Sequence, residues 1–176
     1  MTCSEVMGDN KDMKRKKALA IGFVIFFLFG CAHVVPKEVR KTVDQDIDIK
    51  ALFKEPDAYR GKTVMLGGEI LQLQNRKDGT YIEVLQRQLS SYGRPIIESK
   101  TLGRFMVLSK EFLDPAVFKK GKLLTVVGKV SGTIRGTIGE VEYRYPLIEA
   151  TNLYLLERRS GPSVGVGIGF GFYHGF

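Results

Sequence analysis

The sequence predicts a mainly β domain, and three observations lead to this prediction. Five segments between residues 63 and 156 alternate apolar with polar residues or are rich in Val, Ile and Thr, as β-strands are. The segment after the third of them carries helix signals instead. Glycines inside the first and fourth segments would let a small barrel coil tightly. This element order predicts an OB-fold-like, five-stranded antiparallel Greek-key barrel with a short helix between strands 3 and 4. An open antiparallel sheet with one helix is the alternative.

The elements before the sheet are short. Residues 47–54 have apolar spacing compatible with a short helix, and Pro56 ends it. Residues 57–62 form a turn. The first strand then covers residues 63–73, and the paired glycines Gly67 and Gly68 inside it indicate a bulge or a sharp bend.

A hairpin and a loop connect the next two strands. Residues 77–80 read Lys-Asp-Gly-Thr, and Asp-Gly supplies the positive φ of a tight hairpin turn. The second strand therefore covers residues 81–86. A loop over residues 90–95 follows, and the third strand covers residues 103–109.

Residues 110–118 predict the short helix of this architecture. Their apolar residues have helical spacing, Asp114 suits the N-cap, and Pro115 suits the first turn. The fourth strand covers residues 123–130. A turn lies within residues 135–140, and the fifth strand covers residues 143–156.

The N-terminal region has the features of a bacterial lipoprotein signal peptide. Four basic residues, 14–17, precede an apolar run over residues 18–29, and Leu28-Phe29-Gly30-Cys31 follows. Cleavage before Cys31 would leave its thiol as the site of lipid attachment. A membrane-spanning helix needs about 20 apolar residues, and this run is shorter. Because Phe29 is bulkier than usual for its position, a plain secretory signal and an uncleaved short anchor are the alternatives.

These features divide the chain into four parts. Residues 1–30 are the signal peptide, with translation expected to start at Met13 because residues 1–12 add three acidic side chains to a region that should be basic. Residues 31–46 read as a tether, and residues 47–158 as the folded domain. Residues 159–176 form a Gly-rich tail, which is either flexible or presents its alternating apolar side chains to lipid or a partner.

Charge and cysteine content limit the partners. The whole chain has a formal net charge of +8, and residues 31–176 carry 22 Lys and Arg against 16 Asp and Glu. A basic exported domain is attracted to anionic surfaces such as lipid head groups or phosphorylated glycans, whereas export argues against nucleic acid. Cys31 is the only cysteine after the predicted cleavage point, so no intramolecular disulfide is expected. An acylated sulfur would also protect this lone thiol from oxidation.

The sequence offers little catalytic chemistry. Only His33 and His174 follow the predicted cleavage point, which excludes a His-based triad or a multi-His metal site in the folded domain. We therefore expect no metal, no cofactor and no enzymatic activity. The alternative is a hydrolase of envelope glycan, in which Glu69 and Glu83 face each other across the first hairpin as acid and base.

Three residues are candidates for ligand contact. Arg94, in the loop Tyr92-Gly93-Arg94-Pro95, offers a forked donor to an anion. Tyr143 and Tyr145 lie two residues apart on one sheet face, where aromatic rings can stack sugars or bases. The competing interpretations are that turn chemistry alone explains Gly93 and Pro95 of this loop, and that at least one tyrosine packs in the core.

Motifs in order along the chain resemble the Slp family of outer-membrane lipoproteins, also described as starvation-inducible lipoproteins. They run from about residue 51 to residue 156: Pro56-Asp57-Ala58-Tyr59-Arg60-Gly61-Lys62, Gly68-Glu69-Ile70, Asp78-Gly79-Thr80, Glu83-Val84-Leu85-Gln86, Tyr92-Gly93-Arg94-Pro95, Gly103-Arg104-Phe105, Phe112-Leu113-Asp114-Pro115, Val126-Val127-Gly128 and Tyr143-Arg144-Tyr145-Pro146.

This resemblance implies an envelope lipoprotein of a Gram-negative bacterium that faces the periplasm and is associated with starvation or stress. It implies no catalytic residues, only Cys31 as the carrier of acyl chains such as palmitate. Ala32 after the cysteine fits sorting to the outer membrane. The expected partners are membrane lipid through Cys31 and an anionic glycan, lipopolysaccharide or another envelope protein.

Overall fold

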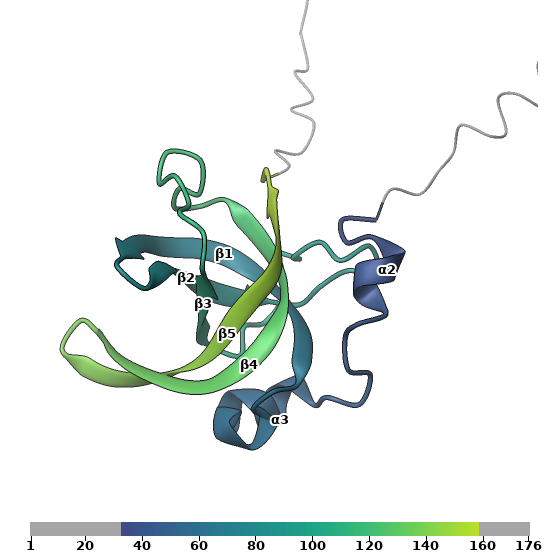
Figure 1. Ribbon diagram of the computed structural model, residues 1–176, viewed down its shortest axis with the longest axis horizontal. Helices are drawn as coiled ribbons and strands as arrows, with labels where there is room; N and C mark the ends of the chain where they lie inside the picture. Colours follow the sequence, from purple (N-terminus) through teal and green to yellow (C-terminus); the bar gives the residue numbers. More distant parts are fainter. Residues whose placement is uncertain (1–32, 159–176) are drawn as a thin grey trace, which may run out of the picture. The chain divides into compact units, whose positions relative to one another are not determined.

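The structure, a computed structural model, describes residues 33–158. Within this part, three short helical elements precede five strands (Figure 1). The helical elements are α2 (Lys37–Arg40), α3 (Ile49–Lys54) and the 3-10 helix η1 (Pro56–Tyr59), and the strands are β1 (Thr63–Arg76), β2 (Gly79–Arg87), β3 (Arg104–Ser109), β4 (Leu123–Ile138) and β5 (Val141–Leu156). In residues 33–158, no helix has the length and apolar composition needed to cross a membrane.

The five strands close into a ring in the order β1-β2-β3-β5-β4, because β4 also pairs with β1. The order β4-β1-β2-β3 makes a Greek key, with β5 filling the gap between β3 and β4. The prediction of a mainly β fold with five strands in a closed ring is therefore confirmed.

The prediction that all strand pairs are antiparallel is wrong at one place. β3 and β5 run parallel and pair over Met106–Leu108 and Leu147–Glu149, whereas the other four strand pairs are antiparallel. The reason is one of parity. Reversing direction at every step around a ring needs an even number of strands, so a ring of five must contain a parallel pair.

The predicted helix between the third and fourth strands is also wrong. Residues 110–122 make turns, of which one is centred on Asp114. The Asp114 carbonyl accepts from the N–H groups of Val117 and Phe118, at 3.0 and 2.9 Å, and its carboxylate accepts from Ala116 N–H at 2.8 Å. The turn cannot continue as a helix, because Gly121 N–H already donates to the Ile70 carbonyl at 2.9 Å and starts the pairing of β4 with β1.

The core of the ring is apolar and includes residues from α3. Asp48 caps this helix by accepting from Lys50 N–H at 2.8 Å, as the sequence favours at a helix start. Leu52 is fully buried, and the Phe53 ring meets the Phe105 ring edge-on at 6.2 Å between centroids. Strand residues complete the core: Val64, Leu66, Ile70, Ile82, Val84, Phe105, Val107, Leu124, Val126, Val130 and Ile148.

The paired glycines of β1 serve close packing rather than a bulge. A Cβ on Gly68 would collide with the backbone carbonyl of Leu85, and one on Gly67 would collide with the Leu89 side chain. The register of β1 against β2 shifts later, between Ile70 and Gln72. The sequence therefore predicts the bulge in the correct strand but not at the correct residues.

The segment before α3 is attached to the ring, although its polar composition predicts a tether over residues 31–46. Val34 N–H donates to the Tyr92 carbonyl at 2.9 Å, and Val35 is fully buried. Asp44 and Thr63 exchange two hydrogen bonds, of 3.0 and 2.7 Å. The predicted signal peptide with Cys31, the first residues of the tether and the Gly-rich tail lie outside the described residues.

β4 and β5 extend beyond the ring as a two-stranded ribbon, which we call the β4–β5 arm and define as residues 133–146. Its register runs from Thr133 opposite Pro146 to Ile138 opposite Val141, and it pairs with no other described strand. Figure 1 shows this arm curving out below the ring at the lower left. Both strands are longer here than the sequence predicts, so the turn is limited to Gly139 and Glu140.

Candidate ligand-binding cleft under the β4–β5 arm

A cleft of about 260 Å³ lies between the β4–β5 arm and strands β1, β2 and β3. Its size is just below the range for small-molecule sites, about 300–1,000 Å³, so it would enclose one small polar group of a longer ligand and leave the rest outside. Its lining is mixed, with amides, charged groups, aromatic rings and two apolar side chains: Gln72, Gln74, Arg76, Tyr81, Glu83, Met106, Ile134, Arg135, Gly136, Thr137 and Tyr145.

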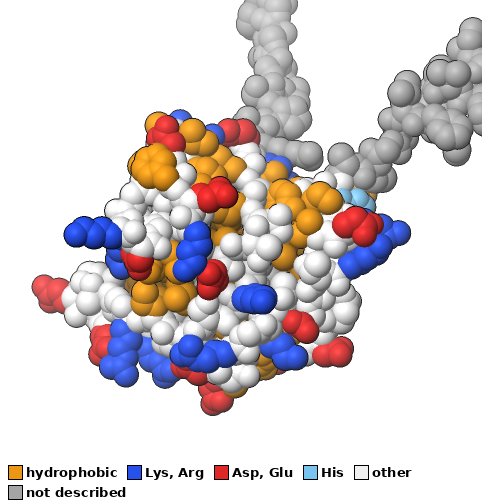
Figure 2. Space-filling model, viewed as in Figure 1, with side chains coloured by type: hydrophobic (Ala, Val, Ile, Leu, Met, Phe, Trp, Pro, Cys, Tyr) orange, Lys and Arg blue, Asp and Glu red, His pale blue; other side chains and the backbone are white. Residues whose placement is uncertain are grey.

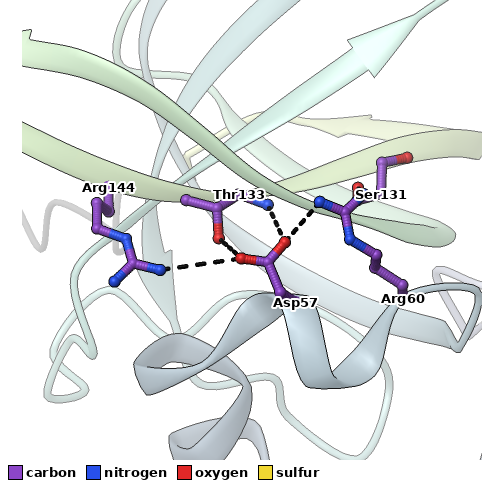
Figure 3. Close-up of polar contacts among 5 residues, drawn as sticks. All are labelled: Asp57, Arg60, Ser131, Thr133 and Arg144. Atoms are coloured by element: carbon purple, nitrogen blue, oxygen red, sulfur yellow. Dashed lines mark hydrogen bonds and ion pairs between the residues drawn. The ribbon is translucent and has the colours of Figure 1, made fainter.

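Asp57 fixes the base of the arm (Figure 3). Its carboxylate accepts from Thr133 N–H at 3.2 Å, from the Thr133 hydroxyl at 2.7 Å and from the Arg60 guanidinium at 2.6 Å. Arg144, from the other strand of the arm, lies 3.9 Å from the same carboxylate. The Thr133 hydroxyl first, and then Arg60, lower the pKa of Asp57, although burial opposes them.

Gly132 lets the arm bend at this point. It has a φ of +107°, and a Cβ there would collide with the Arg60 guanidinium. The same guanidinium donates to the Ser131 carbonyl. The register of β4 against β5 also shifts between Val130 and Gly132, so the bend, η1 and the arm form one connected unit.

Glu83 is the centre of the polar floor of the cleft. Its Oε1 accepts from Arg104 Nη1 at 2.8 Å and from the Tyr145 hydroxyl at 3.2 Å. The Tyr145 side chain is only 2% exposed, and burial first, then Glu83, raises its pKa to about 12. The hydrogen bond to Glu83 raises the pKa of Arg104 as well. Tyr145 therefore keeps its proton at ordinary pH, and Glu83 is a paired carboxylate.

Two guanidinium groups line the cleft from different elements. Arg76, from β1, lies 4.5 Å from the centroid of the Tyr81 ring and donates to Gln74 at 2.8 Å. Arg135, from the arm, lies 3.7 Å from Glu142. Figure 2 shows Lys and Arg side chains gathered at the lower left, where Figure 1 places the arm. The cleft therefore has a positively charged rim over a polar floor.

The two predicted tyrosines lie together but have different positions. Their ring centroids are 4.6 Å apart at 61°. Tyr145 lines the cleft, whereas Tyr143 does not and instead accepts from Arg104 N–H at 3.1 Å. Arg94 is also outside the lining: its guanidinium donates to the Glu157 carbonyl and ties the loop to the end of β5. A ligand contact by any of the three stays a prediction.

The two candidate carboxylates do not face each other in the β1–β2 register. Glu69 lies opposite Leu85, and Glu83 lies opposite Gln72. Each has its own cation, since Glu69 is 3.7 Å from Arg158 and Glu83 bonds Arg104. The expectation that Glu69 and Glu83 face each other across the first hairpin is therefore wrong. Within residues 33–158, no group of three or more His, Cys, Asp or Glu side chains is placed to hold a metal.

Sequence reasoning missed most of the cleft. Gln72, Gln74 and Arg76 alternate along β1 and are exposed, so their spacing places them on one strand face. That alternation could have indicated a polar surface. Nothing local indicates that Arg135 meets this surface, because the arm reaches it only by curving beyond the ring (Figure 1).

The fold and the cleft define a small β-ring domain with an open polar cleft and a preceding segment fixed to the ring. Comparison of the sequence with family models identifies the group: the chain belongs to the Outer membrane lipoprotein Slp family, whose model matches residues 28–167. The resemblance found in the motifs is therefore confirmed.

Three curated relatives match most of the chain. The chain is 29% identical over 135 residues to the uncharacterized lipoprotein YeaY of Escherichia coli (strain K12), covering 77% of this chain and 69% of that protein. It is 28% identical to the outer membrane protein Slp of the same organism, covering 76% and 71%. It is 32% identical to an uncharacterized protein of Haemophilus influenzae, covering 78% and 75%.

Solved structures give a much weaker likeness. The mitochondrial single-stranded DNA binding protein Rim1 of S. cerevisiae has a TM-score of 0.34 and 11% identity, covering 56% of this chain and 98% of that one. The Plasmodium falciparum SSB, solved in complex with ssDNA, has a TM-score of 0.33 and 14% identity, covering 55% and 94%. Likeness at this level carries no conclusion about a ligand.

Proposed function

We propose that this protein is a lipid-anchored lipoprotein of the outer membrane of a Gram-negative bacterium, attached through acylated Cys31 and facing the periplasm. One observation carries the proposal. The family match begins at Leu28, so the sequence Leu28-Phe29-Gly30-Cys31 falls inside the matched stretch. The names of the two Escherichia coli relatives, a lipoprotein and an outer membrane protein, support it.

We further propose that the domain binds a ligand without catalysis. The five-stranded Greek-key ring is OB-fold-like, and such rings bind oligosaccharides or oligonucleotides on their strands and loops. The cleft offers no free acid or base, because Tyr145 retains its proton and Glu83 is paired with Arg104. Binding is therefore the use of this site that its chemistry favours.

An anionic glycan of the envelope fits the cleft best among the expected partners. Arg76 and Arg135 supply charge-assisted donors, and the amides of Gln72 and Gln74 suit sugar hydroxyls. Phosphorylated sugars of lipopolysaccharide have this chemistry, and a site open to the periplasm would meet them before they reach the outer leaflet. A role in starvation or stress is part of the same proposal, and higher abundance in starved cells, measured by quantitative mass spectrometry, would test it.

The anchor is tested by intact mass and membrane fractionation of the chain expressed in a Gram-negative host. The wild type should begin at Cys31, carry diacylglyceryl and acyl mass, and be found in the outer-membrane fraction. The Cys31→Ala variant should lack the added mass and be absent from the outer-membrane fraction, whereas the matched control Cys3→Ala should behave as wild type. An unmodified or uncleaved wild-type chain would refute the anchor.

Binding is tested with the phosphorylated core oligosaccharide released from lipopolysaccharide, titrated calorimetrically into the full chain in detergent. Arg76→Gln and Arg135→Gln should each weaken binding about tenfold, which corresponds to about 1.4 kcal/mol. Lys120→Gln removes the same charge outside the cleft and should leave binding unchanged. The dephosphorylated oligosaccharide should bind more weakly. Equal losses in all three variants would mean that only general charge attraction is measured.

A further inference from the structure

We propose that the connection between β2 and β3, residues 88–103, is the surface with which this protein docks on the bilayer that carries its anchor. The segment 34–41, whose first two residues pack on this connection, is part of the same surface. The inference rests on the proposed acylation of Cys31. It goes further, because it assigns an orientation to the ring and a membrane contact to particular side chains.

The chain is fixed to this surface only three residues after the lipid attachment point. Val34 N–H donates to the Tyr92 carbonyl at 2.9 Å, Val35 is fully buried, and both valines lie against Gly93. Even fully extended, the chain from Cys31 to Val34 spans about 10 Å at most. A bilayer that holds the acyl chains of Cys31 must therefore lie close to the β2–β3 connection.

The same connection exposes large apolar side chains. Tyr92 is 48% exposed, Ile96 is 40% exposed and Leu102 is 37% exposed. Tyrosine is enriched at membrane–water interfaces, where its ring is in the apolar region and its hydroxyl reaches water. Figure 2 shows apolar side chains gathered beside the place where Figure 1 puts α2. A membrane interface would cover this surface and remove it from water.

A hollow of about 680 Å³ opens on the same connection. Leu89 and Leu102 line it together with Ile49 from α3. Arg87 also lines it, and its Nη1 donates to the Ser99 carbonyl at 2.8 Å, which holds the β2–β3 connection against the end of β2.

Docking in this way sets the direction of the cleft. In Figure 1, the β4–β5 arm and α2 lie on opposite sides of the ring. With the β2–β3 connection on the bilayer, the arm and its cleft point away from the membrane. The candidate glycan site would then be open to the periplasm while the protein is anchored.

The absence of tryptophan from the chain allows a direct test. Single variants Tyr92→Trp and Leu102→Trp are made in the full lipidated chain and reconstituted into vesicles of phosphatidylethanolamine and phosphatidylglycerol, with or without brominated acyl chains. Phe112→Trp and Val141→Trp are matched controls, because these residues are 74% and 69% exposed but lie on the β3–β4 connection and at the arm.

The proposal expects brominated lipid to cause a loss of emission at positions 92 and 102 and none at 112 and 141. Equal emission with and without bromine at position 92, in protein that floats with the vesicles, would overturn the docking surface while leaving the anchor intact. Greater loss at position 112 than at 92 would also overturn it. Protein that lacks the lipid mass and does not float would overturn the anchor and, with it, this inference.

Discussion

Tyr145 should make the stability of this protein fall at alkaline pH. Its phenol is buried beside Glu83, and its pKa is raised from the ordinary 10.0 to about 12. Between these two values the unfolded chain has lost this proton while the folded chain retains it. The folded state then binds more protons, so the free energy of unfolding decreases as pH rises. The stabilisation that Tyr145 gives the folded state is fully present below about pH 10 and is lost towards pH 12.

The size of this effect follows from the shift. Two pKa units correspond to about 2.7 kcal/mol in total, and about 1.4 kcal/mol of it is lost by about pH 11. We expect wild type to lose about 1.4 kcal/mol more than Tyr145→Phe between about pH 9 and pH 11, measured by urea unfolding followed by circular dichroism. Comparing the pH dependence of the two proteins removes the effects of other groups and of the lost hydrogen bond at neutral pH.

The Glu83→Gln variant separates the two causes of the raised pKa of Tyr145, which are burial and the neighbouring Glu83 carboxylate. Burial contributes more to the raised pKa of Tyr145 than Glu83 does, so this variant should retain most of the alkaline loss. Equal pH dependence in wild type and Tyr145→Phe would refute the argument, because it would mean that the phenol is not buried in the folded state. Loss of the whole effect in Glu83→Gln would instead show that the order of the causes is wrong.

Three further predictions concern the fold that holds the cleft. Asp57→Ala should loosen the arm, and the measurement is faster amide hydrogen exchange at Thr133. Because the pKa of Asp57 is lowered, the wild-type protein should show the same faster exchange when the pH falls below the usual range of a carboxyl group and Asp57 is protonated. Leu52→Ala should lower the free energy of unfolding by about 2–5 kcal/mol in urea, since it empties a fully buried position. Gly68→Ala should lower the thermal midpoint of unfolding more than an Ala substitution at an exposed strand position does. The reason is that a Cβ at residue 68 would collide with the Leu85 backbone.

The sequence predicts the local elements of this fold well and its long-range pairing poorly. Strand composition and the turn signal at residues 77–80 place β1 and β2 within a few residues of their observed bounds. The apolar spacing of residues 47–54 and the following Pro56 place α3 in the same way. The parallel pairing of β3 with β5 has no local signal, because it depends on how the ring closes.

The remaining errors have the same origin. Asp114 and Pro115 are good helix-start residues, but the pairing of Gly121 with Ile70 leaves room for only one turn. The segment after Cys31 is polar and looks like a tether, yet the buried Val35 side chain and the hydrogen bonds of Val34 and Asp44 attach its described part to the ring. Tertiary contacts overrode local preference in both cases.

The candidate site was predictable only in part. Tyr145 was found from its spacing, and the structure places it in the floor of the cleft. Its partner Glu83 was identified as a hydrolase candidate, because the sequence shows a carboxylate but not the Arg104 guanidinium that pairs with it. Arg135 went unnoticed, since only the curvature of the arm brings it to the cleft.

The parallel contact between β3 and β5 makes assembly of the ring depend on the end of the domain. β1, β2 and β3 can pair with near neighbours in the sequence, whereas β3 must wait for residues 147–149 to complete its second edge. Closing a contact over that length of chain is slow compared with forming a hairpin. Until it forms, the backbone groups on that edge of β3 are open to other chains. A polypeptide cut before residue 147 therefore cannot close the circle, and it would present to its surroundings a strand that the complete protein keeps covered.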